Sequence, residues 1–313
     1  MRFCVPQKTV AGLVFRWILS AVIIAGFASP AMARNEKVNF SDLPGLEHAD
    51  DSLKLDVPYV PTPISVVRTL LKLGSVGPDD FLIDLGSGDG RMVITAAKEL
   101  GARGFGVDLN EKLVKLSEKY AVEEEVADRT RFLVQDIFKT DLHEASVVTM
   151  YLLNEVNLKL RPKLLKELKV GTRIISHDFH MGEWRPDKIL LLSEKKFYQD
   201  DTLLYLWVVP AQVAGNWHWT FSLLGETHSV TMELNQSFQN ISGVTQNGYY
   251  RFVIFDQALE GDRIRFSLVS EAGDRMIHQN YSGRIQGNSI VGLVKLGGTV
   301  TETVMEWKAQ RVK

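Results

Sequence analysis

The fold is decided by one stretch of the sequence, Phe81-Leu82-Ile83-Asp84-Leu85-Gly86-Ser87-Gly88-Asp89-Gly90-Arg91. Four apolar residues interrupted by one carboxylate predict a buried parallel strand, and three glycines at alternate positions predict a tight turn. A helix is predicted over residues 92–100. Glycine suits the turn because it adopts positive φ and lets backbone N–H groups approach a ligand without a Cβ in between. The stretch therefore predicts a nucleotide-binding corner.

The spacing of the glycines argues against a dinucleotide. A dinucleotide-binding loop needs a third glycine or alanine where this chain has Arg91, and the carboxylate of Asp84 would repel a diphosphate. An acid at that position suits a cationic ligand instead. Two further predicted strands, 104–107 and 130–135, also end in acids, Asp108 and Asp136. An acid at the end of the second strand can accept hydrogen bonds from ribose hydroxyls.

The run Asp-x-Gly-x-Gly-x-Gly from Asp84 to Gly90 resembles motif I of the class I methyltransferases. Their cofactor, S-adenosylmethionine, carries an ammonium group and a sulfonium but no phosphate. The resemblance implies an α/β Rossmann-like domain with a seven-stranded, mostly parallel sheet. It also implies that Asp136 meets the adenine amino group and that Ile137 packs on the ring. The alternative is a doubly wound domain whose glycines serve only tight turns.

Two further motifs narrow the resemblance. The segment Tyr59-Val60-Pro61-Thr62-Pro63 and the segment Gly106-Val107-Asp108-Leu109-Asn110 resemble a branch of protein lysine methyltransferases that in animals modify mitochondrial membrane proteins. The resemblance covers residues 57–187 and places Tyr59 and Thr62 beside the methionine moiety. The implied cofactor-binding residues are Tyr59, Thr62, Asp84, Gly86, Ser87, Gly88, Gly90, Asp108, Leu109, Asp136 and Ile137.

The proline-rich segment before the first helix has a predicted structure of its own. Its prolines hold residues 57–63 extended, Thr62 is a predicted N-cap with Pro63 at the first helical position, and residues 64–73 show helical spacing. A stiff arm of this kind can close over a ligand, or it can serve only packing.

The acceptor side is expected at the end of the fourth strand, 147–152. In this fold that end faces the transferable methyl group, so Tyr151, Leu153 and Asn154 are expected to line an acceptor channel. Tyr151 and Asn154 are the candidate catalytic residues, because a phenol and an amide can orient an amine. Methyl transfer is an in-line displacement that depends on positioning more than on a strong base. Tyr151 could equally be a half-buried core aromatic.

A fifth strand, 172–176, leads into His177-Asp178-Phe179-His180. Two histidines and an acid invite a metal hypothesis, but no other clustered Cys or His accompanies them, so a polar rim beside the acceptor channel is favoured and no metal ligand is assigned. Residues 188–197 and 202–209 alternate like a terminal antiparallel pair that completes the sheet.

The composition is that of a soluble two-domain protein. The chain has 313 residues, of which 45% are hydrophobic and 24% are charged. Its formal net charge of −2 gives no excess of positive charge that would indicate nucleic-acid binding. Residues 1–33 read as a secretory signal peptide or an N-terminal anchor, residues 34–56 as a linker, residues 57–210 as the methyltransferase domain and residues 211–313 as an all-β domain. An exported, periplasmic or membrane-associated location follows, although the cofactor is made in the cytosol.

The C-terminal domain is predicted to hold about eight strands, because short alternating runs are separated by Gly, Asn and Asp turns. Its opening, Gly215-Asn216-Trp217, resembles that of small lipocalin-like barrels. Such a barrel could bind an apolar ligand, dock a partner or only cover an edge of the first domain.

The sequence thus predicts an S-adenosylmethionine-dependent methyltransferase that acts on a lysine of a protein, which could be membrane-associated. One alternative is a noncatalytic exported protein that binds the cofactor and an envelope component. Another is a methyltransferase for a small molecule or a lipid. A channel open enough for a protein loop favours lysine, whereas a closed apolar pocket shared with the barrel favours the small acceptor.

Overall fold

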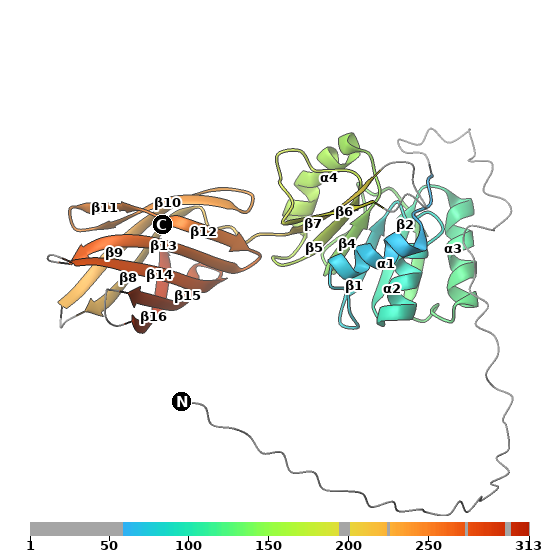
Figure 1. Ribbon diagram of the computed structural model, residues 1–313. Helices are drawn as coiled ribbons and strands as arrows, with labels where there is room; N and C mark the ends of the chain where they lie inside the picture. The colour runs from blue at the N-terminus through green and yellow to red at the C-terminus, as the bar shows by residue number, and fades with distance from the viewer. Residues whose placement is uncertain (1–58, 194–200, 224–225, 273–274, 298–301, 313) are drawn as a thin grey trace, which may run out of the picture. The chain divides into compact units, whose positions relative to one another are not determined.

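The computed structural model describes residues 59–193, 201–223, 226–272, 275–297 and 302–312 (Figure 1). The predicted leader and linker, 1–33 and 34–56, lie outside the described residues. The described strands form two sheets, one of seven strands and one of nine. In the described part of the chain, no helix has both the length and the apolar character needed to cross a membrane.

The first sheet has the strand order β3-β2-β1-β4-β5-β7-β6. Strands β1 to β5 pair in parallel, whereas β7 is antiparallel to both β5 and β6. The predicted seven-stranded, mostly parallel sheet and its terminal antiparallel pair are therefore confirmed, although residues 194–197 of that predicted pair lie outside the described residues. The strands are β1 (Phe81–Leu85), β2 (Arg103–Asp108), β3 (Thr130–Val134), β4 (Val147–Met150), β5 (Arg173–His177), β6 (Lys188–Leu192) and β7 (Thr202–Val208).

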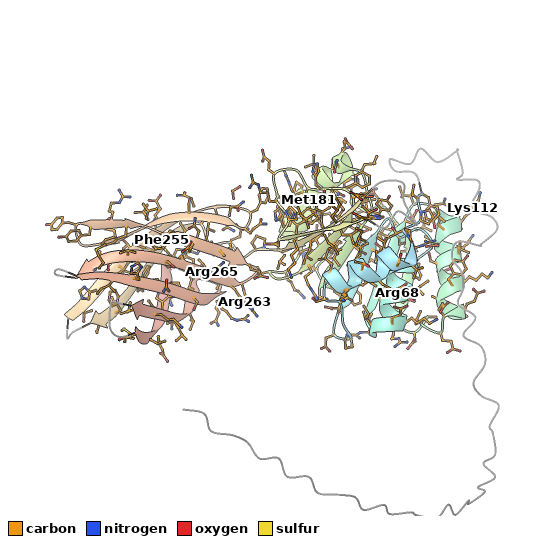
Figure 2. All side chains as sticks on the ribbon, in the orientation of Figure 1. Arg68, Lys112, Met181, Phe255, Arg263 and Arg265 are labelled. Atoms are coloured by element: carbon orange, nitrogen blue, oxygen red, sulfur yellow. The ribbon has the colours of Figure 1, made fainter. Side chains whose placement is uncertain are left out.

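Helix α1 (Ile64–Leu73) precedes β1. Helices α2 (Arg91–Leu100), α3 (Glu111–Glu123) and α4 (Asn154–Glu167) connect β1 to β2, β2 to β3 and β4 to β5. Arg68 of α1, labelled in Figure 2, forms an ion pair with Glu99 of α2. Helix α4 begins four residues before the predicted start at 158, because Leu153 takes the N-cap position in an extended conformation. The polar residues that follow the fourth strand therefore belong to the first turn of α4.

The strand order reverses between β1 and β4, and this position decides where a ligand can bind. The chain moves outward from β1 through β2 to β3 and then returns to β4 on the other side of β1. In open α/β sheets, ligands bind beyond the carboxyl ends of the strands at such a switch point. The buried strand residues Ile83, Leu85, Val148 and Ile174 share one hydrophobic cluster that fixes these strand ends.

One local prediction is wrong. Thr62 does not cap α1: the N-cap is Pro63, and α1 has no side-chain cap. The hydroxyl of Thr62 instead contacts the Nδ1 atom of His177, at 3.1 Å.

The second sheet is antiparallel throughout and has the order β11-β10-β9-β8-β16-β15-β14-β13-β12. It has nine described strands, where about eight were predicted. The amide of Ile254 donates to the carbonyl of Gly243, which brings the two ends of the sheet together into a nearly closed barrel. The strands are β8 (Gly215–Leu223), β9 (Glu226–Ser237), β10 (Asn240–Asn247), β11 (Tyr250–Val253), β12 (Phe255–Glu260), β13 (Arg263–Ala272), β14 (Arg275–Gln286), β15 (Ser289–Gly297) and β16 (Glu302–Val312).

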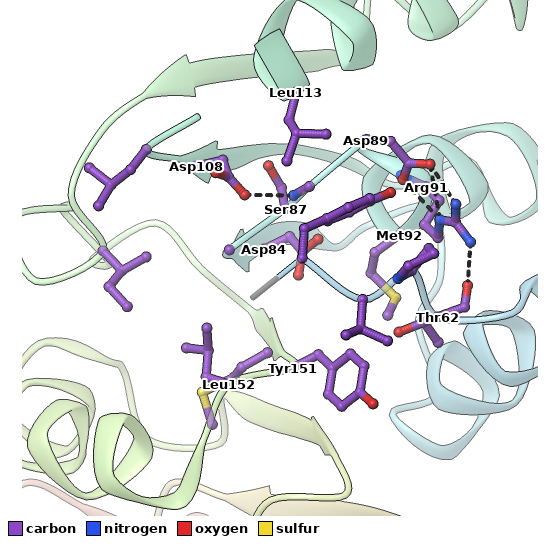
Figure 3. A pocket seen from close by; sticks show the side chains of 18 of the residues that line it. Thr62, Asp84, Ser87, Asp89, Arg91, Met92, Asp108, Leu113, Tyr151 and Leu152 are labelled. Carbon is purple, nitrogen blue, oxygen red and sulfur yellow. Dashed lines mark hydrogen bonds and ion pairs between the residues drawn. The ribbon is translucent and has the colours of Figure 1, made fainter. Parts of the chain in front are cut away.

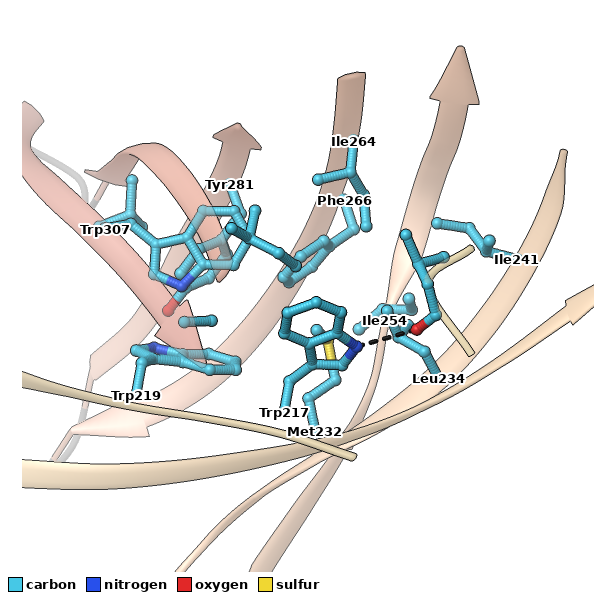
Figure 4. Packing of buried hydrophobic residues seen from close by; sticks show 14 of the residues in the cluster. Trp217, Trp219, Met232, Leu234, Ile241, Ile254, Ile264, Phe266, Tyr281 and Trp307 are labelled. Carbon is cyan, nitrogen blue, oxygen red and sulfur yellow. Dashed lines mark hydrogen bonds between the residues drawn. The ribbon is translucent and has the colours of Figure 1, made fainter. Parts of the chain in front are cut away.

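Aromatic side chains fill the interior of the barrel (Figure 4). Trp217 of the Gly-x-Trp opening is fully buried, its Nε1 donates to the carbonyl of Val213, and the guanidinium of Arg311 lies 4.4 Å from its ring centroid. Arg263 and Arg265 on β13 are exposed and point outward (Figure 2). The remaining large aromatics of the core are Trp219, Phe266, Tyr281 and Trp307.

Candidate functional site

A cavity of about 260 Å³ lies at the carboxyl ends of β1, β2, β3 and β4 (Figure 3). Every residue that lines it falls between positions 59 and 156, within the first domain. The glycine loop and the ends of β2 and β3 form the side of the cavity where the sequence predicts the cofactor, here called the cofactor side. The end of β4 forms the side where it predicts the acceptor, here called the acceptor side. The arm, residues 59–62, lines it as well.

The glycine loop has the conformation that the sequence requires. Gly86, Gly88 and Gly90 all have positive φ, at 80°, 54° and 79°. At Gly88 the close approach matters as much as φ, because a Cβ there would lie 2.4 Å from a ring carbon of Tyr59. The absence of a side chain at this glycine therefore lets the arm lie directly over the loop.

Asp84 is the most buried acid of the three that end the strands. The carboxylate is 6% exposed and accepts a hydrogen bond of 2.6 Å from the hydroxyl of Thr149. Burial, with a smaller contribution from the neighbouring carboxylates of Asp108 and Asp89, raises the pKa of Asp84 to about 7, and the Thr149 bond opposes this rise only in part. A cation in the cavity would relieve the cost of keeping this carboxylate charged.

The other two acids are held in place by backbone amides. Asp108 accepts from the amides of Gly88 and Asn110, both at 2.9 Å, and Asp136 accepts from the amide of Phe138 at 2.9 Å. These bonds orient the carboxylates toward the cavity while leaving lone pairs for a ligand. Each acid thus stands at the end of its strand, as the sequence predicts.

Apolar side chains beside these acids are exposed to solvent. Leu109 is 49% exposed and Phe138 is 36% exposed, although both line the cavity together with Ile137 and Leu113. A flat apolar ring placed between them would remove this surface from water. Acids for an ammonium group and ribose hydroxyls, with apolar walls for a base, fit S-adenosylmethionine.

A buried ion pair supports the arm. The guanidinium of Arg91 pairs with the carboxylate of Asp89 through Nη2 and Nε, and its Nη1 donates to the backbone carbonyl of Thr62 at 2.7 Å. Both charged side chains are more than nine-tenths buried. Burial and the neighbouring carboxylate of Asp89 raise the pKa of the Tyr59 phenol, so the ring beside this pair stays uncharged.

The acceptor side is aromatic. The ring of Tyr151 lies against the imidazole of His177, with 3.9 Å between centroids, and Phe179 lies next to it at 5.8 Å. Leu152 lines the cavity here, whereas Leu153, which was predicted to do so, packs against the hydrophobic core. The predicted acceptor channel therefore has Tyr151 and Leu152 in its wall.

Asn154 has a different position from the one expected. Its Oδ1 accepts a hydrogen bond of 2.9 Å from the amide of His180, and it is not among the residues that line the cavity. It thus anchors the turn after β5. His180 accepts from the amide of Gly182 through Nδ1, so the two histidines of the His177–His180 run make separate contacts.

The structure gathers most of the predicted site residues around one cavity. Those that line it are Tyr59, Thr62, Asp84, Gly86, Ser87, Gly88, Asp108, Leu109, Asp136, Ile137 and Tyr151. Gly90 lies behind the loop, where a Cβ would meet Phe132 and Ser117. The sequence interpretation missed Asp89 and Arg91 as a buried pair and His177 as a partner of the arm. Opposite charges two residues apart, at the end of a glycine loop and the start of the next helix, are a signal that could have indicated the pair.

Comparison with known proteins places the chain among methyltransferases. The family model described as the ANTKMT methyltransferase domain matches residues 84–188. A protein-lysine N-methyltransferase of Saccharolobus islandicus is 40% identical over 154 residues, which cover 49% of this chain and 94% of that protein. A Xenopus laevis relative, named as the lysine N-methyltransferase of the ATP synthase c-subunit, is 33% identical over 186 residues, covering 59% of this chain and 74% of the relative.

A solved structure is also similar. It is described as an RNA methyltransferase from Salinibacter ruber in complex with S-adenosyl-L-homocysteine, and it is 47% identical with a TM-score of 0.46. The similarity covers 49% of this chain and 96% of that one.

Proposed function

We propose that this chain, which belongs to the family of protein-lysine N-methyltransferases, transfers a methyl group from S-adenosylmethionine to the side-chain amine of a lysine in a protein. The observation that carries the proposal is the 40% identity to the Saccharolobus islandicus enzyme over 94% of that enzyme's length. The chain is a class I, S-adenosylmethionine-dependent methyltransferase, as the sequence predicted.

The site supports this chemistry through binding and positioning. When bound, S-adenosylmethionine supplies an activated methyl group on its sulfonium. Asp84, Asp108 and Asp136 would hold the cofactor, and the arm would cover it. The lysine amine, after losing its proton to water, would accept the methyl group in an in-line displacement that leaves S-adenosylhomocysteine.

The amine must be uncharged before it can attack. Deprotonating a lysine of pKa ~10.4 costs about 4 to 5 kcal/mol at pH 7. The ring of Tyr151, which lines the cavity and packs on Phe179, would favour the neutral amine by desolvation, and the cofactor's sulfonium would favour it by charge repulsion. Tyr151 is the residue that we expect to orient the amine.

The relatives, named as protein-lysine methyltransferases, support a protein acceptor over a small one. The aromatic cluster that fills the inside of the barrel favours contact with a partner on its outer face over an enclosed apolar ligand.

The test is methyl transfer with labelled cofactor. The chain is incubated with S-adenosylmethionine carrying a radioactive methyl group and with separated protein, lipid and small-molecule fractions, and an Asp108→Ala variant serves as the control. Methyl-lysine in hydrolysed protein is the expected product. Label confined to lipids or small molecules would refute the lysine acceptor, and cofactor binding without transfer would favour the noncatalytic alternative.

We propose separately that the protein is exported and meets a membrane-associated acceptor. The support is the sequence of residues 1–33, with three basic residues, an apolar run and a small-residue cleavage site. Cell fractionation and N-terminal sequencing test this proposal. Retention in the cytosol with an intact N-terminus would contradict it.

A further inference from the structure

The arm is held on both sides of the site. On the cofactor side, Tyr59 lies over Gly88 and the backbone carbonyl of Thr62 accepts from Arg91. On the acceptor side, the hydroxyl of Thr62 meets the Nδ1 atom of His177, at the end of β5, at 3.1 Å. The arm therefore crosses from the glycine loop to the strand beyond β4.

The contact between Thr62 and His177 is buried and joins residues 115 positions apart. Thr62 is 6% exposed and His177 is 1% exposed. A hydrogen bond shielded from water in this way costs more to lose than a surface bond, because the remaining polar atom cannot turn to solvent. The hydroxyl is available for it because Thr62 does not cap α1.

The surroundings of His177 favour one direction for this bond. Burial lowers the pKa of His177 to about 4, so the imidazole is neutral near pH 7. The Oδ2 atom of Asp178 lies 3.5 Å from Nε2, which favours the tautomer with its proton on Nε2. Nδ1 is then the acceptor, and the Thr62 hydroxyl donates to it.

Asp178 is held in a strained position that serves this geometry. Its φ is +57°, which is unfavourable for a residue with a side chain. Its amide donates to the carbonyl of Leu203 at 2.7 Å, and its Oδ1 accepts from the amide of Leu203 at 2.8 Å. Such strain persists only where surrounding bonds enforce it, and here it places the carboxylate beside the imidazole.

His177 also touches the acceptor side directly, because the ring of Tyr151 lies against its imidazole. One buried side chain therefore contacts both the arm that covers the cofactor and the aromatic wall that faces the amine.

We propose that His177 is a positioning residue, which accepts a hydrogen bond from the Thr62 hydroxyl and thereby holds the arm closed over S-adenosylmethionine while it supports Tyr151. The identity of the bound cofactor rests on the proposed function. His177 itself does not touch the reacting atoms in this scheme. Its effect reaches the cofactor through Thr62.

The test is the pair Thr62→Val and Thr62→Ser, measured by calorimetric titration with S-adenosylmethionine. Valine keeps the shape of threonine without the hydroxyl, whereas serine keeps the hydroxyl. Loss of one such bond predicts that Thr62→Val weakens binding about fivefold and that Thr62→Ser stays within about twofold of the unaltered chain. Equal binding by the valine variant and the unaltered chain would overturn the proposal, as would equal losses in the two variants.

A double-mutant cycle separates this bond from general packing. His177→Leu should weaken binding as Thr62→Val does, and the double variant should be no weaker than His177→Leu alone. His177→Asn, which keeps an acceptor near Nδ1, should retain most of the affinity. If the double variant lost affinity by the product of the two single losses, Thr62 and His177 would act independently and the proposal would be wrong. If His177→Leu fails to fold, the comparison of Thr62→Val with Thr62→Ser alone tests the proposal.

This experiment does not depend on the acceptor. Normal cofactor binding with the predicted pattern, but no methyl-lysine product, would refute the lysine acceptor and leave the role of His177 intact. Methyl-lysine formation together with unaltered cofactor binding by Thr62→Val would support the lysine acceptor and refute the role of His177.

Discussion

Binding of S-adenosylmethionine should depend on pH because of Asp84. Its carboxyl group is buried and has a pKa of about 7 without a ligand. The cationic ammonium group of the cofactor favours the charged carboxylate, so binding should draw a proton off Asp84. Affinity should therefore rise with pH up to about pH 8 and then level off.

The expected magnitude follows from the fraction of charged carboxylate. With a pKa of about 7, roughly one site in ten is charged at pH 6 and nine in ten at pH 8. The dissociation constant should thus be about tenfold larger at pH 6 than at pH 8. Asp84→Asn should bind weakly and show no such dependence, because an amide has no proton to lose in this range.

The same shift has a consequence for stability without ligand. The native state binds more protons at Asp84 than the unfolded state between pH 4 and pH 7, so the free energy of unfolding falls as pH rises through this window. A rise in pKa from 3.8 to about 7 corresponds to about 4 kcal/mol of destabilisation above pH 7. Asp84→Asn removes this cost and keeps an acceptor for Thr149, so it should unfold at a higher urea concentration at pH 8.

Calorimetry in two buffers of different ionisation enthalpy measures the proton released on binding directly. Urea denaturation at pH 5 and pH 8 measures the stability effect. Asp79→Asn, a change to an exposed carboxyl group in the loop before β1, is the matched control and should alter neither quantity. A dissociation constant that is the same at pH 6 and pH 8 would refute the assignment of Asp84 as the group that meets the cofactor's positive charge.

Two other substitutions test the cofactor side. Gly88→Ala would place a Cβ 2.4 Å from the ring of Tyr59, so it should weaken cofactor binding at least tenfold in a calorimetric titration. Gly287→Ala is the control, because Gly287 has a similar φ of +62° but open space around it, and it should leave binding unchanged. Arg91→Ala leaves the carboxylate of Asp89 buried without its partner and should cost about 3 to 5 kcal/mol in the free energy of unfolding measured with urea; a loss below about 1 kcal/mol would show that the pair is solvated.

The parts of the fold that the sequence predicts correctly have local signals. The strand before the glycine loop is apolar, and the loop requires positive φ, so Asp84 and Gly88 could be placed from their neighbours alone. The acids at 108 and 136 follow from one further rule: parallel strands align their carboxyl ends, so acids at the ends of successive strands meet at one edge.

The parts that were missed depend on tertiary contacts. Arg91 was used only to exclude a dinucleotide, since nothing in the local sequence indicates that its guanidinium reaches back to the carbonyl of Thr62. The barrel has nine described strands where about eight were predicted, and β10 shows why such a count is inexact. It contains Ser242, Gly243 and Thr245, which weaken the apolar alternation, and its pairing with β9 stabilises it as a strand.

Thr62 shows how magnitudes decide between a local and a tertiary role. As an N-cap, its hydroxyl would contribute about 1 kcal/mol, and the amides at the half-buried start of α1 have water as an alternative partner. His177 is almost completely buried, and leaving its Nδ1 atom without a donor would cost about 1 to 3 kcal/mol. The hydroxyl therefore goes to the histidine. A residue whose sequence context predicts only a helix start thus becomes the link between the two sides of the site, and the same physical reason makes Thr62→Val the sharpest probe of that link.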